Sequence, residues 1–158
     1  MEEHRIPLTE LLPVIREVLA SGGEFSLKPR GESMRPYFCE GRDTVVLSAM
    51  MQAPKRDDIL LYVRANGVPV LHRVVRVEED GTLSMRGDSQ YFIEYGIKRE
   101  QVVATVKRFY CRGKEKKTDA FGARLYCVRR RVTYPFRSFS RRALGFIKRR
   151  LRRAFKHG

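Results

Sequence analysis

The sequence lacks the features that mark a membrane-spanning or secreted protein. None of its 158 residues fall in an apolar run of about 18 or more, so no transmembrane helix is expected. The N-terminal segment Met1–His4 is acidic and has none of the basic-then-apolar order of a secretion signal. The three cysteines, Cys39, Cys111 and Cys127, show no Cys-x-x-Cys spacing, which argues against zinc and redox motifs. We therefore expect reduced thiols, no metal or cofactor, and a cytoplasmic location.

Acidic residues are scarce in the last third of the chain. Residues 1–110 contain 16 Lys and Arg and 16 Asp and Glu, so their charges balance. Residues 111–158 contain 17 Lys and Arg against 2 acidic residues, so the entire net charge of +15 lies there. This shift predicts a globular domain over 1–110 and a basic tail over 111–158, which suits the chain length.

The pattern of the first 110 residues predicts a mainly β domain that follows one helix. Residues 8–20 have a helical apolar face and a possible cap at Thr9, and Ser21-Gly22-Gly23 ends the helix. Asn66-Gly67 is the strongest hairpin signal, because both residues tolerate positive φ. Apolar, β-favouring runs predict strands over residues 25–28, 44–47, 59–64, 68–77, 82–85 and 102–110.

The tail is predicted to form two basic amphipathic helices after a solvated linker at 112–117. Apolar residues recur at helical spacing, and Tyr134-Pro135 separates the two helices. The two apolar stripes are Phe121, Leu125, Val128 and Val132, and then Leu144, Ile147, Leu151 and Phe155. Eight Lys or Arg surround the second stripe between residues 141 and 156.

Three interpretations of this tail remain open: a solvated charged surface, a nucleic-acid contact, or a contact with an anionic membrane. An apolar stripe flanked by cations is typical of a helix that lies on a membrane surface. No recognised nucleic-acid module accompanies the charge, although cations of this density would also bind phosphates. We therefore favour a peripheral membrane contact through residues 140–157, on the inner face of the cell membrane, over nucleic acid.

Three residues are candidates for catalysis, although each alone has a simpler structural explanation. Ser33 lies in the Gly31–Pro36 loop, where a serine hydroxyl commonly bonds a neighbouring amide. His72 interrupts an apolar strand face, where a histidine is more often a core residue than a base. Asp88 follows a glycine, as turn and capping residues do; the Arg86-Gly87-Asp88 tripeptide also matches an integrin-binding motif, which chance explains.

The order of five short motifs changes this assessment. They are Gly31-Glu32-Ser33-Met34-Arg35-Pro36, Gly41-Arg42-Asp43-Thr44-Val45, Arg56-Asp57-Asp58-Ile59-Leu60, Leu71-His72-Arg73-Val74-Val75 and Met85-Arg86-Gly87-Asp88-Ser89. Over about residues 20–110 the chain resembles the clan of serine peptidases that contains signal peptidase I and the self-cleaving repressors. Where most bacterial members have a lysine base, this sequence has His72, which resembles the Ser–His branch of the endoplasmic reticulum and of spore formers.

The resemblance implies a signal-peptidase-like complex β fold and a role for each candidate residue. Ser33 would attack the scissile carbonyl, His72 would act as the base, and Asp88 would support the imidazole. The chemistry agrees, because a serine needs a base and an ordinary histidine is mostly neutral at cytoplasmic pH. The backbone N–H of Ser33 would help to bind the oxyanion, but Gly31 offers no hydroxyl there, unlike some relatives. The transmembrane tether of the family is also absent from this sequence.

Two functions follow as hypotheses. The first is a serine endopeptidase of signal peptidase I type that removes a leader or signal segment from a peptide or pre-protein. The second is a non-catalytic or self-processing regulatory module that binds an acidic partner, nucleic acid or membrane, through its basic tail. About 20 residues precede the predicted β core, which is too few for the helix-turn-helix domain of a repressor.

Overall fold

A computed structural model of the protein describes residues 6–134. The chain divides into two compact units, Met1–Ala120 and Phe121–Gly158. The first unit is a mainly β body with one leading helix, as the sequence predicts. The predicted boundary at residue 110 differs from this division, because residues that follow it pair with the sheet and belong to the body.

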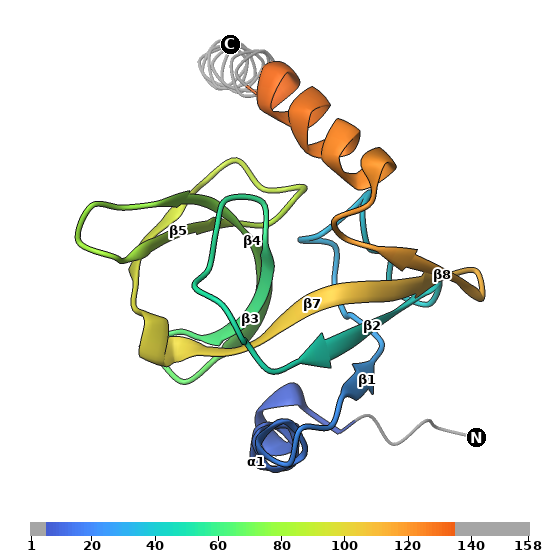
Figure 1. The fold of residues 1–158 in the computed structure, drawn as a ribbon, viewed down its shortest axis with the longest axis vertical. Coiled ribbons are helices and arrows are strands. Elements are labelled where there is room, and N and C mark those ends of the chain that lie inside the picture. Colours follow the sequence, from blue (N-terminus) through green and yellow to red (C-terminus); the bar gives the residue numbers. More distant parts are fainter. Residues whose placement is uncertain (1–5, 135–158) are drawn as a thin grey trace, which may run out of the picture. The chain divides into compact units, whose positions relative to one another are not determined.

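All strands of the body belong to one antiparallel sheet, which curls strongly in Figure 1. The strand order is β1-β2-β7-β3-β4-β5-β6, and β8 pairs with β7 beside this path. The elements are α1 (Leu8–Ala20), β1 (Phe25–Leu27), β2 (Asp43–Ser48), β3 (Ile59–Val63), β4 (Pro69–Val77), β5 (Leu83–Arg86), β6 (Glu94–Ile97), the 3-10 helix η1 (Arg99–Gln101), β7 (Val102–Cys111) and β8 (Lys114–Lys117).

Helix α1 forms where the apolar spacing predicts it, but it begins differently. Pro7, in an extended conformation, is the N-cap, and no side chain caps the helix, so Thr9 does not have the predicted role. Ile15 and Leu19 lie on one face of the helix and are buried. Ser21 ends the helix: its backbone N–H bonds the Glu17 carbonyl, and its hydroxyl bonds the Val18 carbonyl. Through Ile15 and Leu19, the apolar face of the helix packs against the β body.

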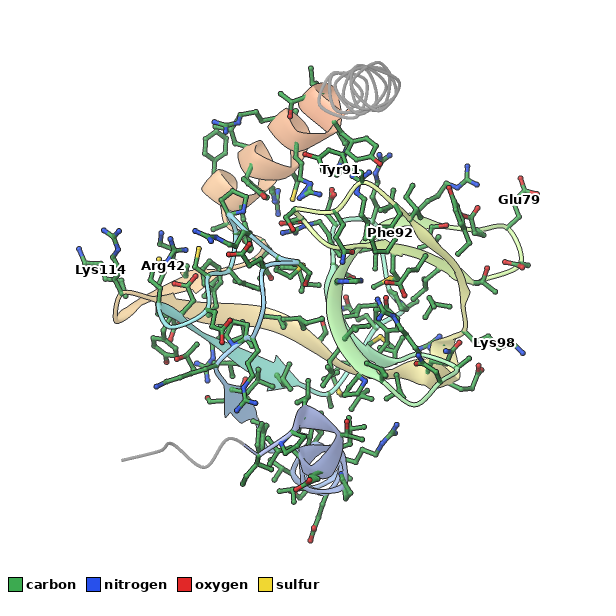
Figure 2. All side chains as sticks on the ribbon, turned by 180° about the vertical axis from the view of Figure 1, so that it is seen from behind. Arg42, Glu79, Tyr91, Phe92, Lys98 and Lys114 are labelled. Carbon is green, nitrogen blue, oxygen red and sulfur yellow. The ribbon has the colours of Figure 1, made fainter. Side chains whose placement is uncertain are left out.

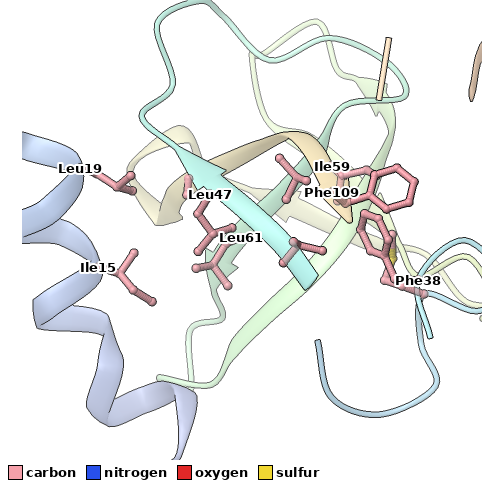
Figure 3. Close-up of a cluster of buried hydrophobic side chains, with 11 residues drawn as sticks. Ile15, Leu19, Phe38, Leu47, Ile59, Leu61 and Phe109 are labelled. Carbon is pink, nitrogen blue, oxygen red and sulfur yellow. The ribbon is translucent and has the colours of Figure 1, made fainter. Parts of the chain in front are cut away.

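The β3–β4 hairpin divides the core in two. Asn66-Gly67 forms its turn, with Gly67 at φ +81° and a bond from the Arg64 N–H to the Val68 carbonyl. Alternate residues of β3 point to opposite faces. Ile59 and Leu61 enter a first core together with α1, β2 and β7, and Figure 3 shows these side chains interlocked.

The second core lies on the opposite face of β3. Leu60 and Tyr62 pack there against Val74 of β4, Leu83 and Met85 of β5, and Ile97. On β4, Val74 belongs to this core and Val70 packs against it, while Leu71 packs against the first core. His72 lies between Val70 and Val74 in the period-two pattern, and contacts Tyr62. Side chains of β4 therefore alternate between the two cores.

Residues 121–134 of the second unit are helical, as the spacing of Phe121, Leu125 and Val128 predicts. The second predicted tail helix from about Ser140, and with it the membrane contact over residues 140–157, lie outside the described residues. Within residues 6–134, the structure contains no helix whose length and hydropathy would let it cross a bilayer.

Candidate functional site

Ser33 is presented by a tight loop that a hydrogen bond to Gly31 holds before the serine and two buried side chains hold after it. Gly31 has φ +74°, a conformation that glycine adopts without strain, and its N–H bonds a Glu40 carboxylate oxygen at 2.9 Å. After the serine, Met34 and Phe38 are buried in the first core, joined by a bond of 3.0 Å from the Phe38 N–H to the Met34 carbonyl. Ser33 itself is half-buried and lines a cavity of about 620 Å³. Met34 and Phe38 thus fix this loop to the first core.

The Ser33 loop is docked on the turn that follows β5. The Ser33 carbonyl accepts hydrogen bonds from the Ser89 N–H at 2.8 Å and from the Ser89 hydroxyl at 3.1 Å. The same hydroxyl is 2.7 Å from the Glu32 carbonyl. A Cβ at Gly87 would lie 2.6 Å from the Ser33 carbonyl oxygen, which is closer than real Cβ contacts come. Glycine at position 87 is therefore what lets the loop approach β5.

Replacing Gly87 by alanine is expected to displace the Ser33 loop, because the obstacle is backbone that the core holds in place. We expect an activity that depends on Ser33 to fall about 10- to 100-fold, since shifts of about 1 Å can cost that much. The measurement is the rate of peptide cleavage, with Gly81→Ala as control; Gly81 has φ +81° but open space around its Cβ position. Equal losses for the two variants would contradict this role for Gly87.

His72 is buried in the second face of the sheet, where its Nδ1 atom meets two oxygen atoms. The side chain is 2% exposed. Nδ1 lies 3.1 Å from the Tyr62 hydroxyl and 3.3 Å from Oε1 of Glu94. The Tyr62 hydroxyl donates to Oε2 of the same carboxylate at 3.0 Å, so its oxygen is free to accept from the imidazole. Both groups that face Nδ1 are therefore acceptors, which assigns the ring proton to Nδ1 and the lone pair to Nε2.

The surroundings keep His72 neutral. Burial is the largest influence and lowers the pKa of His72 below its ordinary value of about 6.5. The Glu94 carboxylate opposes this shift and Arg64 reinforces it. Burial, and then the charge of Glu94, raise the pKa of Tyr62, so its hydroxyl stays protonated. A neutral imidazole with a free Nε2 lone pair is the state that a general base needs.

Glu94 is held as an anion although it is largely buried. Burial alone would raise its pKa, but hydrogen bonds from Arg64 and then Tyr62 lower it overall. The Arg64 Nε–H donates to Oε2 of Glu94 at 2.8 Å, and its Nη2 pairs with Oε1. Glu94 was not among the predicted site residues. It lies 22 positions from His72 in the sequence, and the pairing of Met85 with Glu94 between β5 and β6 brings it there.

Asp88, predicted to support the imidazole, raises the pKa of His72 through its charge, but its hydrogen bonds link it to a different side chain. Both its carboxylate oxygens accept from the Arg73 guanidinium, from Nε at 3.0 Å and from Nη2 at 2.9 Å. Both residues are buried, and Arg73 also donates to the Asp57 carbonyl at 2.9 Å and stacks over the Tyr37 ring at 4.6 Å. The structure thus places Glu94 at Nδ1 of His72, and places Asp88 where it fixes the turn that receives the Ser33 loop.

The Ser33 loop contacts the turn after β5, and His72 lies on β4, the strand that pairs with β5. Arg86 of β5 pairs with Arg73 of β4. Because the two strands are antiparallel, Gly87, which follows Arg86, comes next to the position of His72, which precedes Arg73. The Ser33 carbonyl lies against Gly87. Among the hydrogen bonds of residues 6–134, none joins the Ser33 and His72 side chains. Such bonds are often long before a substrate is bound.

Within residues 6–134, no three His, Cys, Asp or Glu side chains gather in a way that would hold a metal ion. A comparison with models of known protein families found no match, and neither did a comparison with curated protein sequences.

Proposed function

We propose that the protein is a serine endopeptidase of the signal-peptidase type, which removes a leader or signal segment from a peptide. Ser33 is the nucleophile and His72 is the base. The observation that carries the proposal is the orientation of His72: its Nδ1 faces Tyr62 and Glu94, which leaves Nε2 as the basic nitrogen. A buried histidine that served packing alone would not need a charged carboxylate held in place by an arginine.

The reaction follows from these roles. The Ser33 hydroxyl oxygen attacks the scissile carbonyl carbon while Nε2 of His72 takes its proton. The charge of Glu94 stabilises the imidazolium that forms, and that imidazolium then gives the proton to the leaving amine. Water next attacks the acyl-serine ester, with the same nitrogen as base, and releases the second product. Asp88 acts at a distance, because its ion pair with Arg73 holds the turn on which the serine loop rests.

The oxyanion site is the weakest part of this machinery. The backbone N–H of Ser33 is the available donor, and Gly31 has no hydroxyl to add. Loss of one oxyanion donor typically costs about 10²- to 10³-fold in kcat. We therefore expect slow turnover, which suits a processing enzyme that cuts one site in a dedicated substrate.

The sheet beside Ser33 favours an extended peptide as substrate. Residues 69–72 of β4 pair with β3 on one side, while β5 pairs with β4 only from Arg73 onward. Pro69, Val70 and Leu71 line the same cavity as Ser33. β1, which also lines it, pairs with β2 alone in the described sheet. Unpaired strand edges bind extended peptides through backbone hydrogen bonds.

The experiment that tests the proposal is a cleavage screen read by mass spectrometry. The full-length protein is incubated with a diverse peptide library and with small polypeptides encoded beside its gene, in parallel with Ser33→Ala and His72→Ala. We expect products with new termini from the wild type only. Cleavage that survives both substitutions would remove the dyad. A wild type that cuts nothing but binds a partner tightly would favour the regulatory-module hypothesis.

Glu94→Gln is expected to lower kcat about 100-fold. The amide nitrogen of glutamine can donate to Nδ1, which favours the tautomer whose Nε2 carries a proton and cannot act as base. Activity of the wild type should fall as pH drops through the pKa of His72, with a midpoint below 6.5. Because the Glu94 charge raises that pKa, the midpoint in the variant should move to still lower pH.

The measurement is the pH profile of kcat/KM for a peptide found in the screen. Glu100→Gln, an exposed carboxylate in η1, is the control and should leave the profile unchanged. A Glu94→Gln profile that shifts to higher pH would contradict this role for Glu94.

We also infer that the second unit attaches the protein to an anionic membrane. In the helix over residues 121–134, four apolar side chains at helical spacing are highly exposed: Phe121 at 81%, Leu125 at 57%, Val128 at 51% and Val132 at 61%. The surrounding residues 111–158 carry the entire net charge of +15. Each Lys or Arg near an anionic surface adds about 1 kcal/mol of attraction, and the apolar stripe adds insertion.

Co-sedimentation of the full-length protein with vesicles tests this attachment. We expect retention on phosphatidylglycerol vesicles, none on phosphatidylcholine vesicles, and about tenfold weaker binding for Leu125→Glu. Val14→Glu, on α1 and 47% exposed, is the matched control. Equal binding by the two variants, or a gel shift with nucleic acid tighter than the vesicle binding, would point to another partner.

A further inference from the structure

The cavity beside Ser33 has two properties that the cleavage chemistry does not use: it is large, and cations lie at its edge. Its volume is about 620 Å³. One wall is the first turns of α1, where Leu8 and Leu11 contribute, and the floor includes Leu27, Leu61 and Leu71. The methyl side chain of a substrate alanine would leave most of this space empty, whereas cavities of this size typically enclose several apolar groups.

The charge at the edge of the cavity is mainly positive. Lys28 and Arg30 follow β1, are exposed, and belong to the lining. The one carboxylate in the lining, Glu40, is directed to the Gly31 N–H at 2.9 Å. Neither cation has an ion-pair partner among residues 6–134. Two cations beside an apolar cavity complement a carboxylate that lies next to large apolar side chains.

The charge also decides between a separate substrate and the chain's own tail. Residues 111–158 carry 17 Lys and Arg against 2 acidic residues, so Lys28 and Arg30 would repel them. A separate acidic peptide has no such conflict. The occupant that fits is therefore an extended segment from another polypeptide.

We propose that this cavity selects its substrate: it binds an acidic peptide segment through bulky aliphatic or aromatic side chains within a few residues of the cleaved bond, with a Glu or Asp beside them at Lys28 and Arg30. The inference rests on the proposed peptidase function, because Ser33 places the cleaved bond at the cavity. It adds what that function leaves open, namely which side chains surround the cut. Small side chains alone fill too little of the volume to bind well.

The test measures binding apart from cleavage. Fluorescein-labelled peptides on one frame are titrated into full-length Ser33→Ala protein, which binds without turnover. Leu, Phe or Ala is placed at each position in turn, and Glu, Gln or Lys at each flanking position. At the preferred positions, Ala in place of Leu should weaken binding about 10- to 100-fold. Lys in place of Glu should weaken it about tenfold at low salt, and added salt should reduce this difference.

Two pairs of variants, each in the Ser33→Ala protein, locate the effects. Lys28→Glu should reverse the preference for the acidic peptide. Lys98→Glu is the control and should not reverse it, because the Lys98 side chain projects from the body away from α1 (Figure 2). Leu8→Trp should weaken binding of the bulky peptide and spare the alanine peptide. Val14→Trp, on the same helix but outside the cavity lining, should change neither.

The outcomes separate this inference from the function on which it rests. Equal affinity for all peptides, or a Lys28→Glu variant that keeps the acidic preference, would overturn the selectivity. Cleavage by the wild type without any side-chain preference would also overturn the selectivity of the cavity, but the proposal that the protein is a peptidase would stand. Selective binding with no cleavage by the wild type would keep the cavity as a peptide site and overturn the peptidase proposal.

Discussion

Substituting Ser33 by alanine, His72 by alanine, or both at once is expected to lower kcat for peptide cleavage by the same factor, about 10³ to 10⁴. The two side chains act as one unit, since the hydroxyl has no use without a base and the base has no proton to take without the hydroxyl. Loss of either partner therefore already costs the full effect, and losses in such units are far from additive. The residual cleavage rate of these variants should reflect substrate binding and the Ser33 backbone N–H, which the substitutions do not remove.

Single-turnover kinetics on a cleaved peptide measure these rates without interference from product release. Ser21→Ala is the matched control: its hydroxyl bonds a carbonyl at the exposed end of α1, and its loss should leave kcat unchanged. If the loss in the double variant equals the product of the two single losses, Ser33 and His72 act independently. In that case the dyad is the wrong description of this site.

Asp88→Asn is expected to lower the free energy of unfolding by about 3–5 kcal/mol. The carboxylate is fully buried and takes both hydrogen bonds from Arg73, whose side chain is 6% exposed. An asparagine would remove the charge that faces the buried guanidinium in this pair, and breaking buried pairs in this way costs about that much. The loss should appear as a lower urea midpoint at unchanged slope.

Two further variants make this prediction specific. Asp80→Asn, whose carboxylate bonds Thr82 in the exposed β4–β5 turn, should cost at most about 1 kcal/mol. Replacing both charged partners, with Arg73→Met and Asp88→Leu together, should recover much of the stability, because neither charge of this pair then remains buried. If Asp88→Asn is no more destabilising than Asp80→Asn, the Arg73 pair is not what holds this turn.

The strands of the body could be predicted because local patterns determine them. Asn66-Gly67 specifies the hairpin, and the apolar runs on both sides fix β3 and β4 to within a residue or two. Two strands were not predicted, for physical reasons. β6 is short and contains Gly96, and its pairing with β5 decides its conformation. β8 consists of four charged residues, which are typical of a linker, yet it pairs with β7 as an exposed strand.

The partners of His72 and Asp88 could not be read from the sequence. Spacing places His72 on a face of β4, but the identity of its neighbours depends on the sheet order, in which β3 and β5 flank β4. That order brings Tyr62 and Glu94 to the ring and gives Asp88 to Arg73. An arginine beside the histidine was a signal for the latter pairing, because a buried carboxylate needs a positive partner.

The position of β3 has a consequence for how the body comes apart. This strand is a wall common to both cores, with Ile59 and Leu61 on one side and Leu60 and Tyr62 on the other, and all four side chains are wholly inaccessible to solvent. If either half were to melt, one face of β3 would be opened to water and the other half would lose its support. The two halves therefore cannot melt separately, and the serine loop and the imidazole, which depend on different halves, are lost or kept together.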